Sequence, residues 1–379
     1  QVAHGAAHRP RRHAGKMFGD AHALQRLAPR AQAIVHALVL FAAALTLPLR
    51  VSDAMGAPDA NAPVLWLFGV LTLSIGLPFA ALSATAPLAQ AWYARVRAGH
   101  ADGANPYTLY AASNLGSLIA LLSYPTLVEP MLRLQVQTQS WSVGFLLFIA
   151  LMGAVSIVAA RTRGAPAEAA QPERQTTWPE RLIWLALAAA PSSLMLGVTT
   201  YISTDVASAP FLWIAPLALY LITFIIAFQD RPLVPPRSVL LRYAPVPLLG
   251  VVTLTPLMLY FPVQLALHLT GFFITALACH LMLAARRPEP ARLTEFYLLM
   301  SIGGVLGGVF NALIAPVMFN AITEYPLVLA ILCLAFALGG TQMTRARTFV
   351  FALGVAAAEV EFLDDVFHGV PCLKTGRSG

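Results

Sequence analysis

The sequence predicts an all-α fold, a bundle of helices that crosses a membrane many times. Hydrophobic residues make up 58% of the 379 residues and charged residues only 11%, whereas soluble domains carry roughly 25% charged residues. The apolar residues also come in blocks of about 20, the length that a helix needs to cross roughly 30 Å of hydrocarbon. We therefore expect a multi-pass membrane protein whose main partner is the lipid bilayer.

Ten apolar runs, each bounded by charged residues, Pro or Gly, are expected to span the membrane. They lie near residues 31–49, 64–91, 107–128, 141–160, 182–202, 207–228, 238–258, 262–285, 293–319 and 325–340. An eleventh run, 346–358, is short for a span, so its assignment stays open.

The distribution of Lys and Arg predicts the orientation of these spans. With the N-terminus in the cytoplasm, 20 of the 24 Lys and Arg residues fall in cytoplasmic segments, and only Arg50 and Arg133 fall in outer loops. Cytoplasmic loops of membrane proteins carry such an excess of Lys and Arg. The net charge of +7 therefore indicates orientation in the membrane, and we expect no nucleic-acid partner.

The spans fall into two groups around one long polar loop. Residues 161–181 are polar and contain Pro, which is typical of a cytoplasmic linker between two bundles. The first residues are polar and basic and lack the apolar core of a signal peptide. The predicted order is a leader (1–30), a first bundle of four spans (31–160), the linker (161–181), a second bundle of six spans (182–340) and a tail (341–379).

Two pairs of segments repeat with the same six-span offset. Residues 110–121 match residues 297–308, and residues 76–85 match residues 271–280. Parallel six-span halves joined by a long cytoplasmic loop are the arrangement of the major facilitator superfamily. The second half has six spans and the first half four, so we expect a major-facilitator-like fold whose first half lacks two helices.

Small residues in the third and ninth spans predict close helix packing. Without side chains, two membrane helices approach closely and gain van der Waals contact. A phosphate-binding loop would need a strand-to-helix turn, which these apolar spans do not offer. The predicted packing residues are Gly116 and Ala120 in the first copy and Gly303, Gly304, Gly307 and Gly308 in the second.

Four polar residues in or beside the spans are candidates for substrate binding. Polar groups inside a membrane are costly and therefore face protein or a watery cavity. For each, a structural role is the alternative: an interhelical hydrogen bond, a place near the interface, or a helix N-cap. The candidates are Asn114 and Asn311 (hydrogen bond), His280 (interface) and Asp205 (N-cap of the sixth span).

The sequence offers no constellation for catalysis or for a bound cofactor. It contains no GxSxG or HExxH motif. Its three cysteines, Cys279, Cys333 and Cys372, are far apart and lack metal-ligand spacing. We therefore expect no catalytic residue, metal or cofactor in this chain.

Four long stretches carry a family resemblance. Residues 77–94, 105–130, 199–228 and 293–319 resemble, in order, the membrane portion of bacterial fused major-facilitator/spermidine-synthase proteins. The resemblance implies a bacterial inner-membrane location, a spermidine-synthase-like domain or protein as partner, and a polyamine as ligand.

The chain departs from this family in one important respect. A synthase-like domain needs a Gly-rich turn after a strand, and the stretch after the tenth predicted span, 341–379, is too short to form one. We therefore expect a membrane module that anchors or serves a polyamine-related activity and is not an enzyme by itself. The alternatives are an autonomous transporter of a polyamine or other organic cation, and a truncated product without activity.

Overall fold

The computed structural model describes residues 29–51, 54, 56–58, 61–97, 107–161, 176–203, 212–229, 260–288, 292–319, 325, 327–328 and 332. These residues form helices, and no strand occurs among them. Six helices are long and apolar enough to cross a membrane: Pro63–Ala94, Thr108–Met131, Leu134–Arg161, Trp178–Tyr201, Pro262–Ala284 and Glu295–Met318. The prediction of an all-α chain with several membrane-spanning helices is confirmed for this part.

The elements follow the predicted spans closely. The α-helices are α2 (Pro29–Ala44), α3 (Pro63–Leu71), α4 (Leu77–Val96), α5 (Thr108–Ser123), α6 (Glu129–Met131), α7 (Leu134–Arg161), α8 (Trp178–Tyr201), α9 (Ile214–Phe228), α12 (Phe261–Ala284), α13 (Leu293–Val309) and α14 (Ala315–Met318). Three π-helical segments are η2 (Thr72–Gly76), η3 (Tyr124–Val128) and η6 (Phe310–Ile314). Eight of the ten predicted spans coincide with these elements. Residues 238–258, most of 325–340, and 346–358 lie outside the described residues.

The start of α8 illustrates how the sequence sets a helix boundary. Thr177 and Glu180 form a capping box, in which the Glu180 N–H donates to Thr177 Oγ1 and the Thr177 N–H donates to Glu180 Oε2 (2.8 Å). Two of the N–H groups at the helix start are thereby satisfied. Pro179 occupies the first turn, where its missing N–H costs nothing. The helix therefore begins at Trp178, inside the predicted linker 161–181.

Hydroxyl side chains inside the apolar helices are satisfied locally. Their hydroxyls donate to the carbonyl one turn earlier, so no polar group faces lipid unpaired at these positions. The bonds run from Ser74 to Val70, from Ser156 to Met152, from Thr199 to Met195 and from Thr275 to Gly271, with oxygen–oxygen distances of 2.6–2.7 Å.

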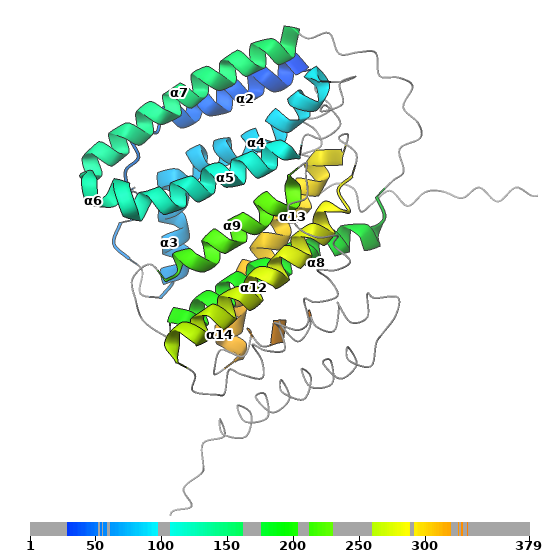
Figure 1. Cartoon of the computed structure of the whole chain (residues 1–379). Helices are drawn as coiled ribbons and strands as arrows, with labels where there is room; N and C mark the ends of the chain where they lie inside the picture. The colour runs from blue at the N-terminus through cyan, green and yellow to red at the C-terminus, as the bar shows by residue number, and fades with distance from the viewer. Residues whose placement is uncertain are drawn as a thin grey trace, which may run out of the picture.

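The helices pack as two groups that share one boundary. One group consists of α2, α4 and α7, and the other of α8, α9, α12 and α13 (Figure 1). Helix α5 lies between them, because it packs against both α4 and α9. Helix α4 also contacts α13. The first and second halves of the chain thus meet along α4 and α5 on one side and α9 and α13 on the other.

Each group has its own apolar core. The smaller core, in the first group, is formed by Leu40, Ala43, Ala81, Trp92, Phe145, Met152 and Ala159. The larger core lies in the second group and includes Trp184, Leu194, Val198, Phe224, Phe228, Phe272, Leu283 and Phe296. Tyr107 and Ala111, at the start of α5, belong to this second core. The beginning of α5 is therefore fixed to the second group although it belongs to the first half of the sequence.

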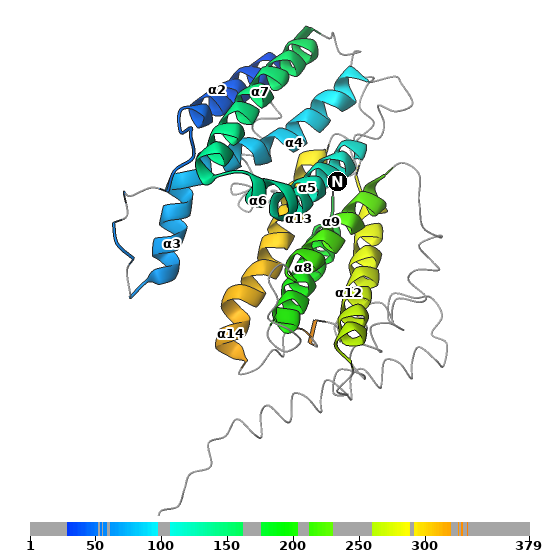
Figure 2. The same ribbon diagram turned by 60° about the vertical axis from the view of Figure 1, so that its left-hand side comes forward.

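Helices α3 and α4 are continuous in the chain but not straight. They meet at an angle, and η2 (Thr72–Gly76) lies between them (Figure 2). Sharp bends in helices commonly occur at such π-bulges. The predicted span 64–91 is therefore a bent helix whose first part stands apart from α8 and α12 in this view.

Two long units in different halves have the same construction. The unit α5–η3–α6 runs from Thr108 to Met131 and the unit α13–η6–α14 runs from Leu293 to Met318. Met131 and Met318, the last residues of the two units, are separated by the same number of residues as Tyr110 and Tyr297 in the sequence repeat. Each unit is interrupted by a five-residue π segment, at Tyr124–Val128 and at Phe310–Ile314.

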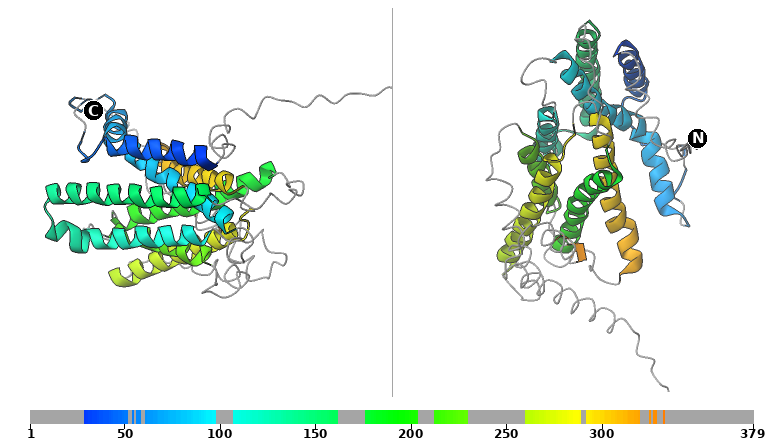
Figure 3. Two further views of the ribbon diagram at one scale, coloured as in Figure 1. Left: turned by 90° about the horizontal axis from the view of Figure 1, so that it is seen from above. Right: turned by 90° about the vertical axis from the view of Figure 1, so that its right-hand side faces the viewer.

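The long helices lie side by side, so that many outer faces are uncovered (Figure 3). Only 11% of the most apolar stretch of α5 is buried, compared with 50% in α8 and in α12. Exposed apolar side chains on α7 include Leu147 and Leu151. Such a surface suits contact with lipid, which is as apolar as these side chains.

Candidate functional site

His280 lies in the larger core, on α12, and is fully buried. Its Nδ1 atom is 2.8 Å from Oγ1 of Thr223 on α9. The Thr223 hydroxyl donates its proton to the carbonyl of Tyr220 (2.6 Å), so it accepts a hydrogen bond from the imidazole. The network therefore assigns the proton of His280 to Nδ1.

The other ring nitrogen of His280, Nε2, is the one that is available to bind a further group. Nε2 is buried and has no hydrogen-bond partner among the described residues. With the proton on Nδ1, Nε2 carries a free lone pair and accepts an N–H or O–H donor. Phe224 stacks on the imidazole, with ring centroids 3.7 Å apart. This histidine can thus bind a donor group but is held among aromatic rings.

Asn114 is connected to His280 through two aromatic side chains. Its amide donates to the carbonyl of Tyr110 on the same helix (2.8 Å). The ring of Tyr110 meets Phe224 edge-on, with centroids 5.4 Å apart, and Phe224 stacks on His280. Asn114 and His280 therefore belong to the same layer, formed by α5, α9 and α12, and do not touch each other directly.

An aromatic cluster fills the boundary between the two groups of helices. Six rings from α5, α9 and α13 contact one another: Tyr107, Tyr110, Phe224, Phe228, Phe296 and Tyr297. The Tyr297 hydroxyl donates to Gln90 Oε1 on α4 (2.6 Å). The Tyr107 hydroxyl donates to the carbonyl of Pro288 (2.6 Å). The cluster thus joins the two halves through ring contacts and through hydrogen bonds.

Asn311 is placed elsewhere, on η6 directly after α13, where this unit contacts α8. Its amide donates to Ser193 Oγ on α8 (2.5 Å) and to the carbonyl of Gly307 (3.1 Å). Ser192, also on α8, donates to the carbonyl of Gly304 (2.9 Å). Asn311 therefore makes an interhelical hydrogen bond and lies on a different contact from Asn114.

Two of the glycines allow α13 to approach the backbone of α8. A methyl group at Gly303 would lie 2.5 Å from the carbonyl oxygen of Leu185 and 2.8 Å from Cβ of Ala188. A methyl group at Gly307 would overlap the carbonyl oxygen of Ala189 and lie 2.9 Å from the Ser193 nitrogen. Real side chains do not tolerate such distances, so both positions require glycine.

The other predicted packing residues have more space. Nothing lies within 4 Å of the Cβ position at Gly304 or at Gly116, and Gly308 has only an ordinary contact with Leu196. Gly116 and Ala120 are exposed on α5. Close packing is therefore observed at Gly303 and Gly307 within the described residues.

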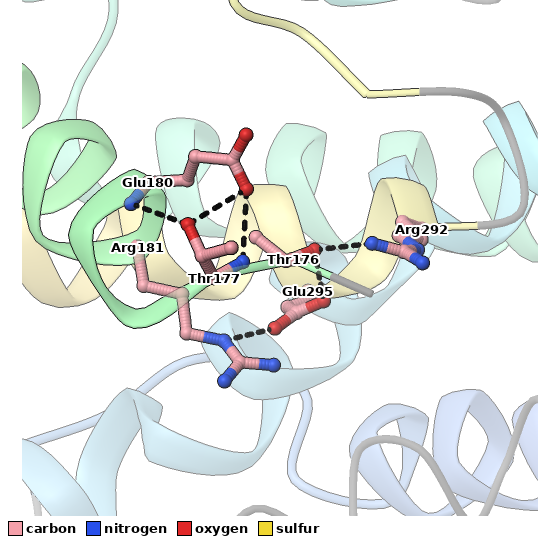
Figure 4. A network of polar contacts seen from close by, with 6 residues as sticks. All are labelled: Thr176, Thr177, Glu180, Arg181, Arg292 and Glu295. Atoms are coloured by element: carbon pink, nitrogen blue, oxygen red, sulfur yellow. Dashed lines mark hydrogen bonds and ion pairs between the residues drawn. The ribbon is translucent and has the colours of Figure 1, made fainter. Parts of the chain in front are cut away.

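A polar network ties the start of α8 to the start of α13 (Figure 4). Arg181 Nε donates to Glu295 Oε1 (2.6 Å), and Thr176 Oγ1 donates to Glu295 Oε2 (3.3 Å). Arg292 donates to Thr176 Oγ1 (2.7 Å). The guanidinium group of Arg181 also lies over the ring of Trp178, and this cation–π contact orients the side chain. The network orients the two helices at the end that the charge distribution predicts to be cytoplasmic.

Sequence reasoning missed a polar layer in the first group. His36 Nε2 lies 3.1 Å from Thr85 Oγ1, which donates its proton to the Ala81 carbonyl. Trp92 Nε1 donates to Gln32 Oε1 (3.2 Å). All four side chains that form these two pairs are buried. The sequence contained a signal for this layer, since polar residues inside apolar runs are costly unless they are paired.

A second buried histidine was also missed. His268, on α12, bonds through Nδ1 to the Tyr325 hydroxyl (3.0 Å) and contacts the ring of Tyr201. Gln264 donates to the Tyr201 hydroxyl (2.9 Å). His268 Nε2 is buried without a partner among the described residues.

The predicted site residues do not converge on one point. Asn114 and His280 share one layer, Asn311 lies on η6 against α8, and Asp205 lies outside the described residues. No group of three or more His, Cys, Asp or Glu side chains suited to a metal occurs among the residues that the structure describes. Comparison of the chain with protein-family models, curated proteins and solved structures finds no match.

Proposed function

We propose that this chain is a major-facilitator-like membrane module that anchors or serves a polyamine-related activity. The observation that carries the proposal is the pair of units α5–η3–α6 (Thr108–Met131) and α13–η6–α14 (Leu293–Met318), which have the same order of elements. Major-facilitator halves are parallel repeats related by an axis along the membrane normal. Two units with the same order of elements, a five-residue π interruption in each and ends at the repeat offset support such a repeat.

The polyamine connection rests on the sequence. Residues 77–94, 105–130, 199–228 and 293–319 resemble the membrane portion of fused major-facilitator/spermidine-synthase proteins. We propose on this basis that the chain resides in a bacterial inner membrane with its N-terminus in the cytoplasm, and that its partner is a spermidine-synthase-like domain or protein.

The polar side chains between the helices bond to one another, which supports an anchoring role. Tyr297 with Gln90, and Asn311 with Ser193, join helices by direct hydrogen bonds. Interhelical bonds of this kind contribute about 0.6–2 kcal/mol each in membranes. These side chains hold the bundle together, as a scaffold requires.

The proposal is tested by purifying the tagged chain, in mild detergent, from membranes of the cells that encode it. The preparation is then assayed for transfer of an aminopropyl group to labelled putrescine. We expect transfer activity to remain with the tagged chain and to be absent from a mock purification. Activity that is found only in the soluble fraction would contradict the proposal.

The buried His280 favours a second candidate, a secondary transporter of a polyamine or other organic cation. Its unpartnered Nε2 accepts an N–H donor such as an amine. Labelled spermidine uptake into proteoliposomes under a proton gradient tests this function. Uptake that is lost in His280→Phe would favour the transporter, and no uptake above protein-free liposomes would remove it.

A further inference from the structure

Two adjacent arginines follow directly after the long apolar helix α12. This helix contains no Asp, Glu, Lys or Arg, and its 24 residues are enough to cross the hydrocarbon of a bilayer. Arg286 and Arg287 come next but one after its last residue, Ala284, and both are exposed. Their side chains therefore lie where the hydrocarbon ends and the lipid headgroups begin.

The backbone that carries these arginines is held from two sides. The indole N–H of Trp184 on α8 donates to the carbonyl of Arg286 (3.1 Å). The hydroxyl of Tyr107, next to the start of α5, donates to the carbonyl of Pro288 (2.6 Å). Both donors are buried. The turn after α12 is thus fixed by contacts with the first and the second half of the chain.

Both guanidinium groups are also oriented. The central carbon of the Arg287 guanidinium lies 5.2 Å from the centroid of the Tyr107 ring. Nη1 of Arg286 donates to the carbonyl of Met282, one turn back on α12 (3.3 Å). A guanidinium group has five N–H donors, so these contacts leave most of the donors of both side chains available.

Two other arginines in the second group of helices have polar partners within the chain. Arg181 pairs with Glu295 (2.6 Å), and Arg292 donates to Thr176 (2.7 Å). In contrast, no acidic side chain among the described residues forms an ion pair with either arginine after α12. The turn therefore carries two positive charges that this part of the chain does not neutralise.

The general excess of Lys and Arg on the cytoplasmic side explains the sign of these charges but not their fixed position. That excess is a matter of how many Lys and Arg residues a loop contains. A held guanidinium group can do more, because it forms two parallel N–H···O bonds with a phosphate. Anionic lipids give the cytoplasmic leaflet a negative surface potential, and basic sites between membrane helices bind their headgroups.

We propose that Arg286 and Arg287 bind the phosphate of an anionic phospholipid, on the turn that Trp184 and Tyr107 hold in place. Both guanidinium groups donate N–H bonds to the phosphate oxygens. A zwitterionic lipid binds less tightly, because the two arginines repel its ammonium group. The proposal uses neither the sequence repeat nor polyamine chemistry, so it goes beyond the proposed function and is tested separately from it.

The test measures lipid binding to the purified full chain in mild detergent by native mass spectrometry. The chain is titrated with phosphatidylglycerol and, in parallel, with phosphatidylcholine. We expect the first phosphatidylglycerol to bind about tenfold more tightly than the first phosphatidylcholine. Glycerophosphoglycerol, the same headgroup without acyl chains, separates a lipid from a soluble phosphate compound. Equal affinity for the two lipids, or for phosphatidylglycerol and glycerophosphoglycerol, would overturn the proposal.

Substitution by glutamine removes the charge of each arginine and keeps a polar side chain. Arg286→Gln and Arg287→Gln are each expected to weaken phosphatidylglycerol binding about fivefold, the effect of one basic residue at an anionic membrane surface. Arg161→Gln, at the exposed arginine that ends α7, is the matched control and is expected to leave binding unchanged. An equal loss in Arg161→Gln would show a general attraction to the positive surface and would contradict a site at the end of α12.

A further variant tests the contribution of the fixed turn. Tyr107→Phe removes the donor to the Pro288 carbonyl but keeps both arginines and the aromatic ring beside Arg287. We expect phosphatidylglycerol to bind about threefold more weakly, because the turn is then less preorganised. Tyr124→Phe, at an exposed tyrosine of η3, is the control and is expected to bind as wild type does. Equal affinities of the two variants would contradict the role of the held turn.

Discussion

Leu132 and Phe319 end the two matched units in the same way. They occupy corresponding positions in the repeat, and both leave the helix in an extended conformation, with φ −118° and ψ 132° at Leu132 and φ −117° and ψ 143° at Phe319. Each N–H donates to the carbonyl four residues earlier, Leu132 to Val128 (2.9 Å) and Phe319 to Ala315 (2.8 Å). The two units therefore end in the same way at corresponding positions of the repeat.

The contact between α8 and α13 predicts different effects for two neighbouring glycines. Gly307→Ala places a methyl group on the Ala189 carbonyl and near the Ser193 nitrogen. We expect the free energy of unfolding in detergent to fall by about 1–3 kcal/mol, the cost of overpacking. Gly304→Ala is the matched control, because nothing lies within 4 Å of its Cβ position. Equal stabilities of the two variants would show that α8 does not contact Gly307.

The Thr223–His280 pair predicts a strong coupling between α9 and α12. Thr223→Val removes the acceptor of the Nδ1–H group and leaves a buried donor unpaired. We expect a loss of about 1–3 kcal/mol in the free energy of unfolding. The double variant Thr223→Val with His280→Phe has no unpaired donor, so it is expected to be more stable than Thr223→Val alone. Additive losses in this double-mutant cycle would argue against the hydrogen bond.

The hydrogen bond from Tyr297 to Gln90 predicts how the two halves are joined. Tyr297→Phe keeps the ring but leaves Gln90 Oε1 buried without this donor. The expected cost is about 1–3 kcal/mol in the free energy of unfolding, measured by denaturant titration in detergent. Tyr124→Phe, at an exposed tyrosine, is the control and is expected to change stability little. A wild-type stability in Tyr297→Phe would remove this link between α4 and α13.

The ion pair between Arg181 and Glu295 is partly exposed, with side-chain exposures of 30% and 17%. Glu295→Gln is therefore expected to lower the free energy of unfolding by only about 1 kcal/mol. The difference from wild type should shrink in 1 M salt, where the Debye length is about 3 Å. Glu129→Gln serves as the control, because Glu129 begins α6, at the end of the helices away from Glu295. A salt-independent difference would show that Glu295 acts through its hydrogen bonds and not through its charge.

The fold was largely predictable because one physical rule dominates it. A helix must be about 20 apolar residues long to cross the hydrocarbon, and these blocks are visible in the sequence. The bend at Thr72–Gly76 was not predictable in this way, because a π segment changes the hydrogen-bonding pattern and not the hydropathy. Helix α9 begins at Ile214, and the predicted start of its span, near residue 207, lies outside the described residues.

The polar residues were predictable as a class, but their partners were not. Asn311 and His280 were identified because they interrupt apolar spans, yet their partners Ser193 and Thr223 lie 118 and 57 residues away. Such pairs depend on how the helices are rotated against each other. The hydropathy of a single sequence does not contain that rotation.

The two matched units are proposed to cross the membrane in the same direction, and labelling their ends tests this most directly. Single cysteines at Leu132 and Phe319, and at Arg161 and Ala285, are introduced into a variant without Cys279, Cys333 and Cys372. An impermeant maleimide is then added to intact cells and to inverted vesicles. We expect labelling of positions 132 and 319 from outside and of 161 and 285 from the cytoplasmic side. Labelling of 132 and 319 from opposite sides would contradict the parallel arrangement.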